Sequence, residues 1–330
     1  THDGPQRTAQ ARREAREREE RERRAAERAR EQAREDVLRQ AEAHQALLAR
    51  LMQNAARDGA KSAMITFQPH PRVVLQNIQG PFYLACEAEK QVLLAESGLD
   101  YVFTLTFDRK LAELNAAQFL SLLLKHLDLR GLTVSENFAL GKDRTGTLRE
   151  LGKQCARHAV TLDIVPPFCL HGKPVSSGRV REALETGDVR GAADLLGHPY
   201  FVRSKVVEGK HLGSKLGFPT ANQVVNPQKI LPKYGVYATR ASFNGEKLMG
   251  VNSVGVRPPF ETTTQANIET LLLDFDDNIY HENLTVEFIE YLRPEIKYER
   301  VQDLIDQIEQ DKREARRILT HESCPENLSA

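Results

Sequence analysis

The sequence contains no tryptophan, and it has only three methionines and four cysteines among its 330 residues. The cysteines are widely spaced and form no Cys-x-x-Cys pair, so neither a zinc site nor a disulfide framework is indicated. No apolar run is long enough to span a bilayer, and we expect neither a membrane anchor nor a signal peptide. These absences favour a reduced, cytoplasmic setting.

Net charge is also absent, because 46 lysines and arginines balance 46 aspartates and glutamates. A balanced chain gives no electrostatic reason to bind nucleic acid or a membrane surface, and we expect neither as a partner. The hydrophobic fraction of 40% is sufficient for packed cores, and the length allows about two domains.

Residues 1–50 form a charged arm that is almost entirely Arg, Glu, Ala and Gln between Ala11 and Arg39. These residue types are strong helix formers, and glutamates lie four positions before arginines in the favourable order. Apart from alanine, no apolar residue precedes Val37, so we expect a long, solvated helix. The interleaved glutamates argue against nucleic-acid binding, and a protein partner for this helix stays an open alternative.

The region from residue 51 to residue 197 alternates between apolar runs and helical stretches. The runs predict strands at Ala63–Phe67, Tyr101–Phe107, Leu132–Val134 and Val160–Val165. The helices expected between them are Ala85–Glu96, Ala116–Leu127 and Thr147–His158. Such alternation predicts a doubly wound α/β domain over residues 51–197.

The last part of the chain, residues 198–330, has the pattern of short strands. Phe201–Val207 alternates between apolar and polar residues and predicts a strand. Asn244-Gly245 separates Gly235–Phe243 from Lys247–Val254. This dipeptide predicts a hairpin, because a type I′ turn requires positive φ at both central positions.

A second hairpin is predicted to join Ile268–Phe275 to Leu284–Tyr291. Many short strands at regular spacing indicate a small closed barrel over residues 198–330. A helix with one apolar face between Val301 and Leu319 is expected to follow it.

The stretch from Gly209 to Asn222 reads GKHLGSKLGFPTAN and is the strongest candidate for chemistry. Its glycines at 209, 213 and 217 allow positive φ and let a polyanion approach the backbone N–H groups. Thr220 and Asn222 offer oxygen donors of the kind that Mg²⁺ and phosphate prefer. The loop is not a Walker A motif, because no Gly-Lys-Ser/Thr closes it. On spacing alone, an ordinary glycine-rich turn between two strands is the favoured alternative.

Five motifs follow one another between about Tyr200 and Leu319. They are Leu216–Asn222 (LGFPTAN), Leu231–Tyr237 (LPKYGVY), Asn252–Phe260 (NSVGVRPPF), Ile268–Phe275 (IETLLLDF) and Leu292–Lys297 (LRPEIK). In this order they resemble the riboflavin kinase module of the prokaryotic bifunctional riboflavin kinase/FMN adenylyltransferase family. The resemblance implies a six-stranded barrel with a C-terminal helix. It also implies a transferase that makes FMN and ADP from riboflavin and MgATP.

The resemblance also implies roles for individual residues of the glycine loop. The implied contacts of the ATP phosphates are Gly209, Gly213, Lys215, Gly217, Phe218, Pro219, Thr220 and Asn222. Thr220 and Asn222 are also the implied Mg²⁺ ligands.

Glu269 lies in an otherwise apolar strand, and on that pattern alone it is best interpreted as an outward-facing residue. With the resemblance it becomes the general base that acts on the ribityl 5′-hydroxyl. Leu271 departs from the family, which often has histidine there. The implied flavin-binding residues are Asn252, Arg257 and Arg293. For Arg293, a surface ion pair with Glu295 is the alternative.

A weaker resemblance, to the adenylyltransferase module of the same family, covers roughly Ala43 to Gly197. Thr66-Phe67 and Pro69-His70-Pro71 are retained. The family's Phe-Asp-Gly-Val-His-x-Gly-His loop is not retained as one stretch. Asp3-Gly4 resembles its start and His44 lies at its end, and the charged helix separates the two. The paired histidines that would bind ATP phosphates are therefore absent at the required spacing, and so is the strand that leads into the loop.

Ser177 and Arg181 belong to a stretch that resembles the family's Ile-Ser-Ser-Thr-x-Ile-Arg, with Gly178 in place of the threonine. They are candidate anion contacts at a helix start, although an N-cap role for Ser176 or Ser177 is the commoner one. With Asp3, His44 and His70 they make up a vestigial adenylyltransferase site in a degenerate domain. The main prediction is therefore a riboflavin kinase. The alternatives are a bifunctional enzyme that also makes FAD, and a flavin-binding regulatory protein without turnover.

Overall fold

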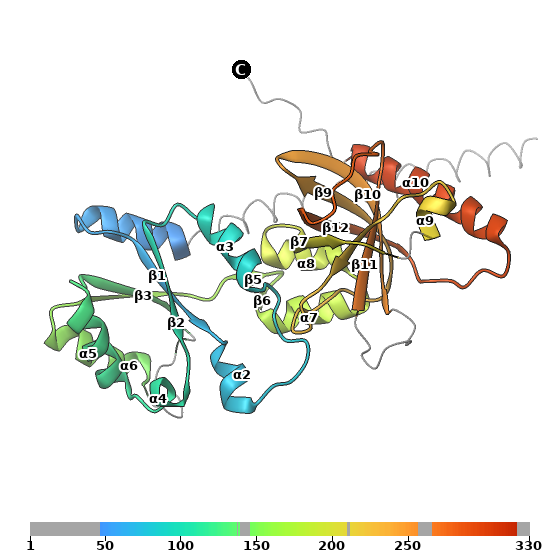
Figure 1. The fold of residues 1–330 in the computed structure, drawn as a ribbon. Helices are drawn as coiled ribbons and strands as arrows, with labels where there is room; N and C mark the ends of the chain where they lie inside the picture. The colour runs from blue at the N-terminus through green and yellow to red at the C-terminus, as the bar shows by residue number, and fades with distance from the viewer. Residues whose placement is uncertain (1–46, 137, 139–145, 210–211, 257–265, 322–330) are drawn as a thin grey trace, which may run out of the picture.

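The computed structural model describes residues 47–136, 138, 146–209, 212–256 and 266–321. The charged arm, with Asp3 and His44, and the loop residue Arg257 lie outside these ranges. Figure 1 shows two lobes, an α/β lobe coloured blue to green and a barrel lobe coloured yellow to red.

The α/β lobe begins with a helix over residues 47–57. Its further elements are β1 (Ala63–Gln68), α2 (Pro71–Gln76), α3 (Glu87–Ala95), β2 (Tyr101–Thr106), α4 (Arg109–Ala112), α5 (Ala116–His126), β3 (Gly131–Ser135), α6 (Leu148–Arg157) and β4 (Thr161–Val165). The four predicted strands and three predicted helices are confirmed to within two residues. β1 pairs with β2 and β3 with β4, both in parallel, as the α/β prediction requires. In the described residues, however, the two pairs are not hydrogen-bonded to each other.

The core of this lobe is small and lies between β3 and the helices α5 and α6. Leu120, Leu151 and Cys155 are each 1% exposed and pack with Val134 and Val160. Asn115 and Thr147 cap the two helices by accepting hydrogen bonds from backbone N–H groups three residues later. The strand β1, by contrast, is only half-buried along its whole length.

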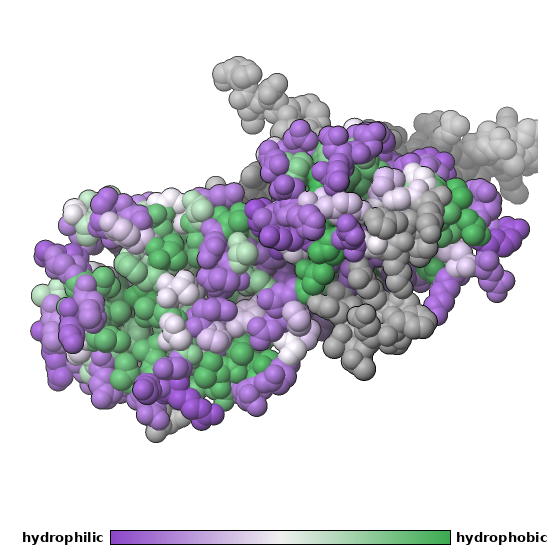
Figure 2. Space-filling view, viewed as in Figure 1, coloured by the Kyte–Doolittle hydropathy of each residue, from purple (hydrophilic) through white to green (hydrophobic). Residues whose placement is uncertain are grey.

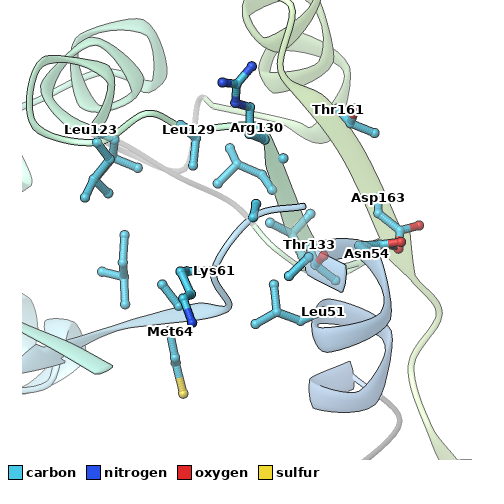
Figure 3. Close-up of a pocket in the computed structure, with 18 of the residues that line it drawn as sticks. Leu51, Asn54, Lys61, Met64, Leu123, Leu129, Arg130, Thr133, Thr161 and Asp163 are labelled. Carbon is cyan, nitrogen blue, oxygen red and sulfur yellow. Dashed lines mark hydrogen bonds between the residues drawn. The ribbon is translucent and has the colours of Figure 1, made fainter. Parts of the chain in front are cut away.

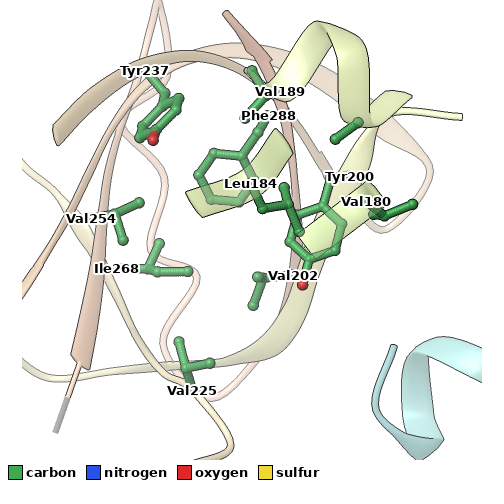
Figure 4. Close-up of a cluster of buried hydrophobic side chains, with 11 residues drawn as sticks. Val180, Leu184, Val189, Tyr200, Val202, Val225, Tyr237, Val254, Ile268 and Phe288 are labelled. Atoms are coloured by element: carbon green, nitrogen blue, oxygen red, sulfur yellow. The ribbon is translucent and has the colours of Figure 1, made fainter. Parts of the chain in front are cut away.

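The short hairpin β5 (Cys169–Leu170) and β6 (Lys173–Pro174) leads into α7 (Ser177–Thr186) and α8 (Val189–Leu196). The sequence places these two helices in the α/β region, but their apolar faces pack on the barrel. Figure 4 shows Leu184 and Val189 beside Tyr200 and Phe288 in one buried cluster. The hydrophobic core of the barrel therefore includes residues of α7 and α8, which precede the barrel strands in the chain.

The barrel consists of six strands and two accompanying helices. They are β7 (Tyr200–Val207), α9 (Leu212–Lys215), β8 (Ala221–Val224), β9 (Gly235–Phe243), β10 (Glu246–Val256), β11 (Ala266–Leu272), β12 (Asn283–Arg293) and α10 (Val301–His321). The strands close in the order β10-β11-β8-β7-β12-β9, so the predicted six-stranded barrel and its C-terminal helix are confirmed. The hairpin at Asn244-Gly245 is also confirmed, with φ of 47° and 87° at its two turn residues.

The prediction of a second hairpin, between β11 and β12, is wrong. β11 pairs with β10 and β8, whereas β12 pairs with β7 and β9. Residues 273–282 separate the two strands, and this connection is too long for a tight hairpin turn. It carries the chain past two intervening strands of the barrel.

Candidate active site on the barrel

The pairing of β8 with β11 brings two of the predicted site residues together. Glu269 and Asn222 are register partners, and residues directly opposite each other in a ladder point to the same face of the sheet. Ile268 and Thr270 are 0% exposed, whereas Glu269 between them is exposed. The carboxylate therefore lies on the outer face of the barrel.

Asn267 joins these two residues, and sequence reasoning missed it. Its Nδ2 donates a hydrogen bond of 2.8 Å to Oε1 of Glu269 and one of 3.4 Å to Oδ1 of Asn222. Asn267 is only 8% exposed, so its amide is held by the surrounding sheet. The signal that could have found it is its position two residues before Glu269, which puts both side chains on the same face of β11.

The glycine loop folds against the same residues. A Cβ on Gly209 would lie 2.4 Å from Nδ2 of Asn222, so only glycine allows this close approach. A Cβ on Gly213 would lie 2.3 Å from the carbonyl oxygen of Phe218 and 3.5 Å from Oγ1 of Thr220. The loop thus turns back on itself, and its start at Gly209 meets Asn222 at its end.

Other residues of the loop hold it in place. Gly217 follows α9 with φ of +85°, a conformation that favours glycine. Phe218 is 8% exposed and packs in the core beneath α10, with Nζ of Lys312 5.2 Å from its ring centre. Pro219 is exposed and Thr220 is half-buried. Lys215 is the last residue of α9.

Two predicted flavin residues are engaged elsewhere. Arg293 forms a bidentate ion pair with Asp311 of α10, with Nη2 2.7 Å from Oδ2. The expected alternative, an ion pair between Arg293 and Glu295, is wrong, because Glu295 instead accepts a hydrogen bond from Ser253. Asn252 is 0% exposed inside the barrel, where it donates to Oγ1 of Thr270 at 2.7 Å. The structure therefore does not bring Asn252 to the face that carries Glu269.

In the α/β lobe, His70 and Arg181 gather around Phe82. The Arg181 guanidinium lies 5.0 Å from the ring centre of Phe82 and donates to its carbonyl oxygen at 3.0 Å. The imidazole of His70 lies 5.1 Å from the same ring. Burial lowers the pKa of His70, and the positive charges of Lys90, Arg72 and Arg181 lower it further.

Ser177 is the first residue of α7, and the preceding Ser176 is its N-cap, with Oγ accepting from N of Arg179 at 3.4 Å. The N-cap alternative is therefore confirmed for Ser176. In the described parts of the chain, no three His, Cys, Asp or Glu side chains are grouped to hold a metal ion. In those same parts, no helix combines the length and apolar character that crossing a bilayer requires.

Comparison with known proteins gives two family models that match successive parts of the chain. The riboflavin kinase model matches residues 196–319, and the FAD synthetase model matches residues 42–179. The bifunctional riboflavin kinase/FMN adenylyltransferase of Listeria monocytogenes is 34% identical over 83% of this chain and 87% of its own. The protein of that name from Escherichia coli K12 is 35% identical with the same two coverages.

One similar solved structure is titled a macrolide-efflux protein from Streptococcus pneumoniae. It is 28% identical, has a TM-score of 0.74, and the match covers 83% of this chain and 89% of that one. The similarity in both sequence and structure therefore extends over both lobes.

Proposed function

The chain belongs to the family of bifunctional riboflavin kinase/FMN adenylyltransferases, and from this membership we propose a riboflavin kinase whose active face is the outer face of β8 and β11. The protein transfers the γ-phosphate of ATP to riboflavin and yields FMN and ADP. The observation that supports the location is the continuous set of contacts from Gly209 to Asn222 and through Asn267 to Glu269. These contacts put a carboxylate beside the glycine loop, whose backbone N–H groups are the proposed phosphate contacts.

The side chains next to the glycines fit a divalent cation. Thr220 and Asn222 supply neutral oxygen donors, and Mg²⁺ commonly takes few protein ligands together with phosphate oxygens. When bound, Mg²⁺ would neutralise negative charge on the transferred phosphoryl group. The absent side chains of Gly209 and Gly213 let the loop pack closely against Asn222 and the carbonyl oxygen of Phe218, which fixes the loop beside Asn222 and Thr220.

Glu269 would act as the general base. Its carboxylate would accept the proton of the ribityl 5′-hydroxyl while that oxygen bonds to the γ-phosphorus and the bond to the ADP oxygen breaks. Asn267 would orient the carboxylate, because its amide donates to Oε1 and leaves Oε2 for the substrate hydroxyl. The outward position on the barrel gives the ribityl chain access to this oxygen.

The test is the formation of FMN from riboflavin and MgATP, followed by chromatography. We expect Glu269→Gln to lower kcat by about 10²–10⁴-fold, the range typical for loss of a general base. Glu246→Gln is the matched control, because Glu246 is an exposed carboxylate at the far hairpin of the barrel. The proposal would be contradicted if the wild type formed no FMN, or if E269Q formed FMN at the full wild-type rate.

The second candidate activity is adenylylation of FMN to FAD. The match of residues 42–179 to the FAD synthetase model favours it, as does the group of cations around Phe82. Against it stands the absence of the family's paired histidines at their required spacing. Incubation of FMN with MgATP decides the question, because an FAD peak establishes the activity and its absence excludes it. Three statements stay predictions. They are the cytoplasmic setting, the lack of a nucleic-acid partner, and the presence of a protein partner for residues 1–50.

A further inference from the structure

Polar side chains are buried inside the barrel, directly behind the proposed active face. In the α/β lobe, Leu51, Met64 and Leu123 line a cavity of about 1010 Å³ (Figure 3), and hydrophobic residues also gather over the surface of that lobe (Figure 2). The barrel interior combines apolar residues with polar side chains that are each 0% exposed, namely Gln223, Thr239, Asn252 and Thr270. Because a buried polar group costs free energy unless it is hydrogen-bonded, the contacts of these side chains indicate what each one does.

Asn252 of β10 and Thr270 of β11 are hydrogen-bonded to each other inside the barrel. They are register partners in the antiparallel ladder, and Nδ2 of Asn252 donates to Oγ1 of Thr270 at 2.7 Å. A side-chain pair that lies directly opposite across two strands stabilises one pairing of those strands over the others. The hydrogen bond therefore supports the register of β11 from inside the barrel.

Thr270 directly follows Glu269 in β11. Because successive side chains of a strand point to opposite faces, the buried Thr270 and the exposed Glu269 depend on the same register. A slip of β11 by one residue would turn the carboxylate into the barrel and end its pairing with Asn222. A contact that holds Thr270 inside therefore also holds Glu269 on the proposed active face.

The leucines that follow Thr270 do not specify this register. Leu271 and Leu273 pack in the cluster beneath α10, whereas Leu272 packs with Leu284 in the barrel interior. Since both faces of this end of β11 are apolar, a slip would exchange one leucine for another. The polar pair distinguishes the two faces, because a displaced Thr270 would lose its hydrogen bond.

The strand β8 has the same arrangement behind Asn222. Gln223 follows Asn222, and its Nε2 donates to the carbonyl oxygens of Ser204 at 3.1 Å and of Leu284 at 2.8 Å. Both strands that carry the proposed site therefore have a hydrogen-bonded polar side chain on the inner face, next to the site residue.

We propose that Asn252 and Thr270 are positioning residues of the kinase, whose buried hydrogen bond fixes the register of β11 and holds the carboxylate of Glu269 beside Asn222. The inference rests on the proposed function, because it assigns the pair to the general base of that reaction. Asn252 then acts through Thr270 from within the barrel and not by contact with the flavin.

The test compares kcat and KM for riboflavin in FMN formation. Thr270→Val keeps the shape of the side chain and removes the hydroxyl, whereas Thr270→Ser keeps the hydroxyl. We expect Thr270→Val to lower kcat by about tenfold with KM for riboflavin within about twofold, because a displaced base slows the reaction and leaves substrate binding in place. Thr270→Ser should recover most of the lost kcat. Wild-type kcat in Thr270→Val would overturn the proposal.

Thr239→Val is the matched control. Thr239 is as buried as Thr270, and a Cβ on Gly250 would lie 3.0 Å from Oγ1 of Thr239 and 3.2 Å from Cγ2 of Thr270, so both threonines lie against the same glycine. Among the residues that the structure describes, Oγ1 of Thr239 has no hydrogen-bond partner, so its removal should leave kcat unchanged. An equal loss of kcat in Thr239→Val would overturn the proposal, since any buried hydroxyl would then have the same effect.

The double variant Asn252→Leu with Thr270→Val separates positioning from stability. Replacing both partners of a buried hydrogen bond by apolar groups of similar size is often nearly neutral for stability. We expect the double variant to have the wild-type urea midpoint but the same loss of kcat, about tenfold, as Thr270→Val alone. Wild-type kcat in the double variant would overturn the proposal. So would a rise in KM for riboflavin confined to Asn252→Leu, because Asn252 would then contact the flavin.

Hydrogen exchange tests the register without turnover, and it separates this inference from the proposed function. Amide exchange at residues 267–272 should be about tenfold faster in Thr270→Val than in Thr239→Val, with β7 and β12 unchanged. Equal exchange in the two variants would overturn the proposal. A wild type that forms no FMN, together with this difference in exchange, would contradict the proposed function and leave the role of the pair in the register of β11 supported.

Discussion

The two lobes differ in how the edges of their β-strands are paired. In the barrel each of the six strands has a neighbour on both sides, and Tyr237, Ile268, Leu284 and Phe288 are 0% exposed. In the α/β lobe, the described strands form two separate pairs, and β1 remains half-buried. Closure removes edges altogether, whereas the two strand pairs of the α/β lobe leave edges that have no ladder partner among the described residues.

The difference extends to the candidate sites. On the barrel, sheet pairing holds Asn222 and Glu269 side by side and leaves the carboxylate exposed. In the α/β lobe, Arg181 already donates to the carbonyl oxygen of Phe82, and His70 caps α2. The candidate carboxylate of the barrel is therefore open to a substrate, whereas the polar groups of Arg181 and His70 are engaged by the protein itself. Three experiments test this difference between the lobes.

The largest effect is expected at the connection between the lobes. Lys229 is 4% exposed, and its ammonium group donates to Oε2 of Glu89 at 2.7 Å and to the carbonyl oxygens of Leu84 and Phe201. Lys229→Met would leave Glu89, which is 2% exposed, as an unpaired buried charge. We expect a loss of about 3–5 kcal/mol in the free energy of unfolding, measured by urea titration and circular dichroism.

The matched control is Lys247→Met, an exposed lysine of β10, for which we expect a change of less than about 0.5 kcal/mol. Adding Glu89→Gln to Lys229→Met should recover part of the loss, because the buried charge is then removed. Identical urea midpoints for the two single variants would show that the lobes do not depend on this ion pair.

The second-largest effect is expected from Gly213 of the glycine loop, with Gly178 of α7 as the comparison. Gly213→Ala places a Cβ 2.3 Å from the carbonyl oxygen of Phe218, so the glycine loop must shift. A displacement of about 1 Å can cost about 10²-fold in rate, and we expect kcat/KM for ATP to fall by about 10–10²-fold. The measurement is the initial rate of FMN formation over a series of ATP concentrations.

Gly178→Ala is the counterpart, because its Cβ would meet its nearest neighbour, Oγ of Ser176, at 3.7 Å, an ordinary contact. FMN formation should be unchanged in this variant. If instead Gly178→Ala slowed FMN formation as much as Gly213→Ala, the loss of rate could not be assigned to the glycine loop.

The sequence predicted those parts of the fold that depend on neighbouring residues. The Asn244-Gly245 turn identified its hairpin because both the turn and the pairing are local. The pairing of β11 with β8 was missed, since nothing near Ile268 indicates a partner at Gln223. Similarly, the helical periodicity of α7 reveals an apolar face but not that this face packs on the barrel.

The candidate site was also predicted where local motifs identify it and missed where contacts between distant residues decide it. Glu269 and Asn222 were identified by their motifs, and the structure shows them to be adjacent. Asn267 was overlooked because its hydrogen bond to Glu269 depends on the face that the strand presents. The alternative prediction that Arg293 pairs with Glu295 was wrong. Glu295 is close to Arg293 in sequence, whereas Asp311 comes near only when α10 packs on the barrel.

The smallest effect concerns the pH dependence of the α/β lobe. The pKa of His70 is lowered from 6.5 by burial and by nearby Lys90, Arg72 and Arg181. As pH falls below 6.5, the unfolded chain binds a proton at this position before the folded chain does, so the stability of the folded state decreases. His70→Asn keeps an N-cap for α2 but removes the titrating group. Thermal unfolding of the two proteins should therefore agree above pH 7 and diverge below pH 6.5, with the wild type losing more. The same difference at every pH would mean that His70 acts through packing against Phe82 and not through its proton.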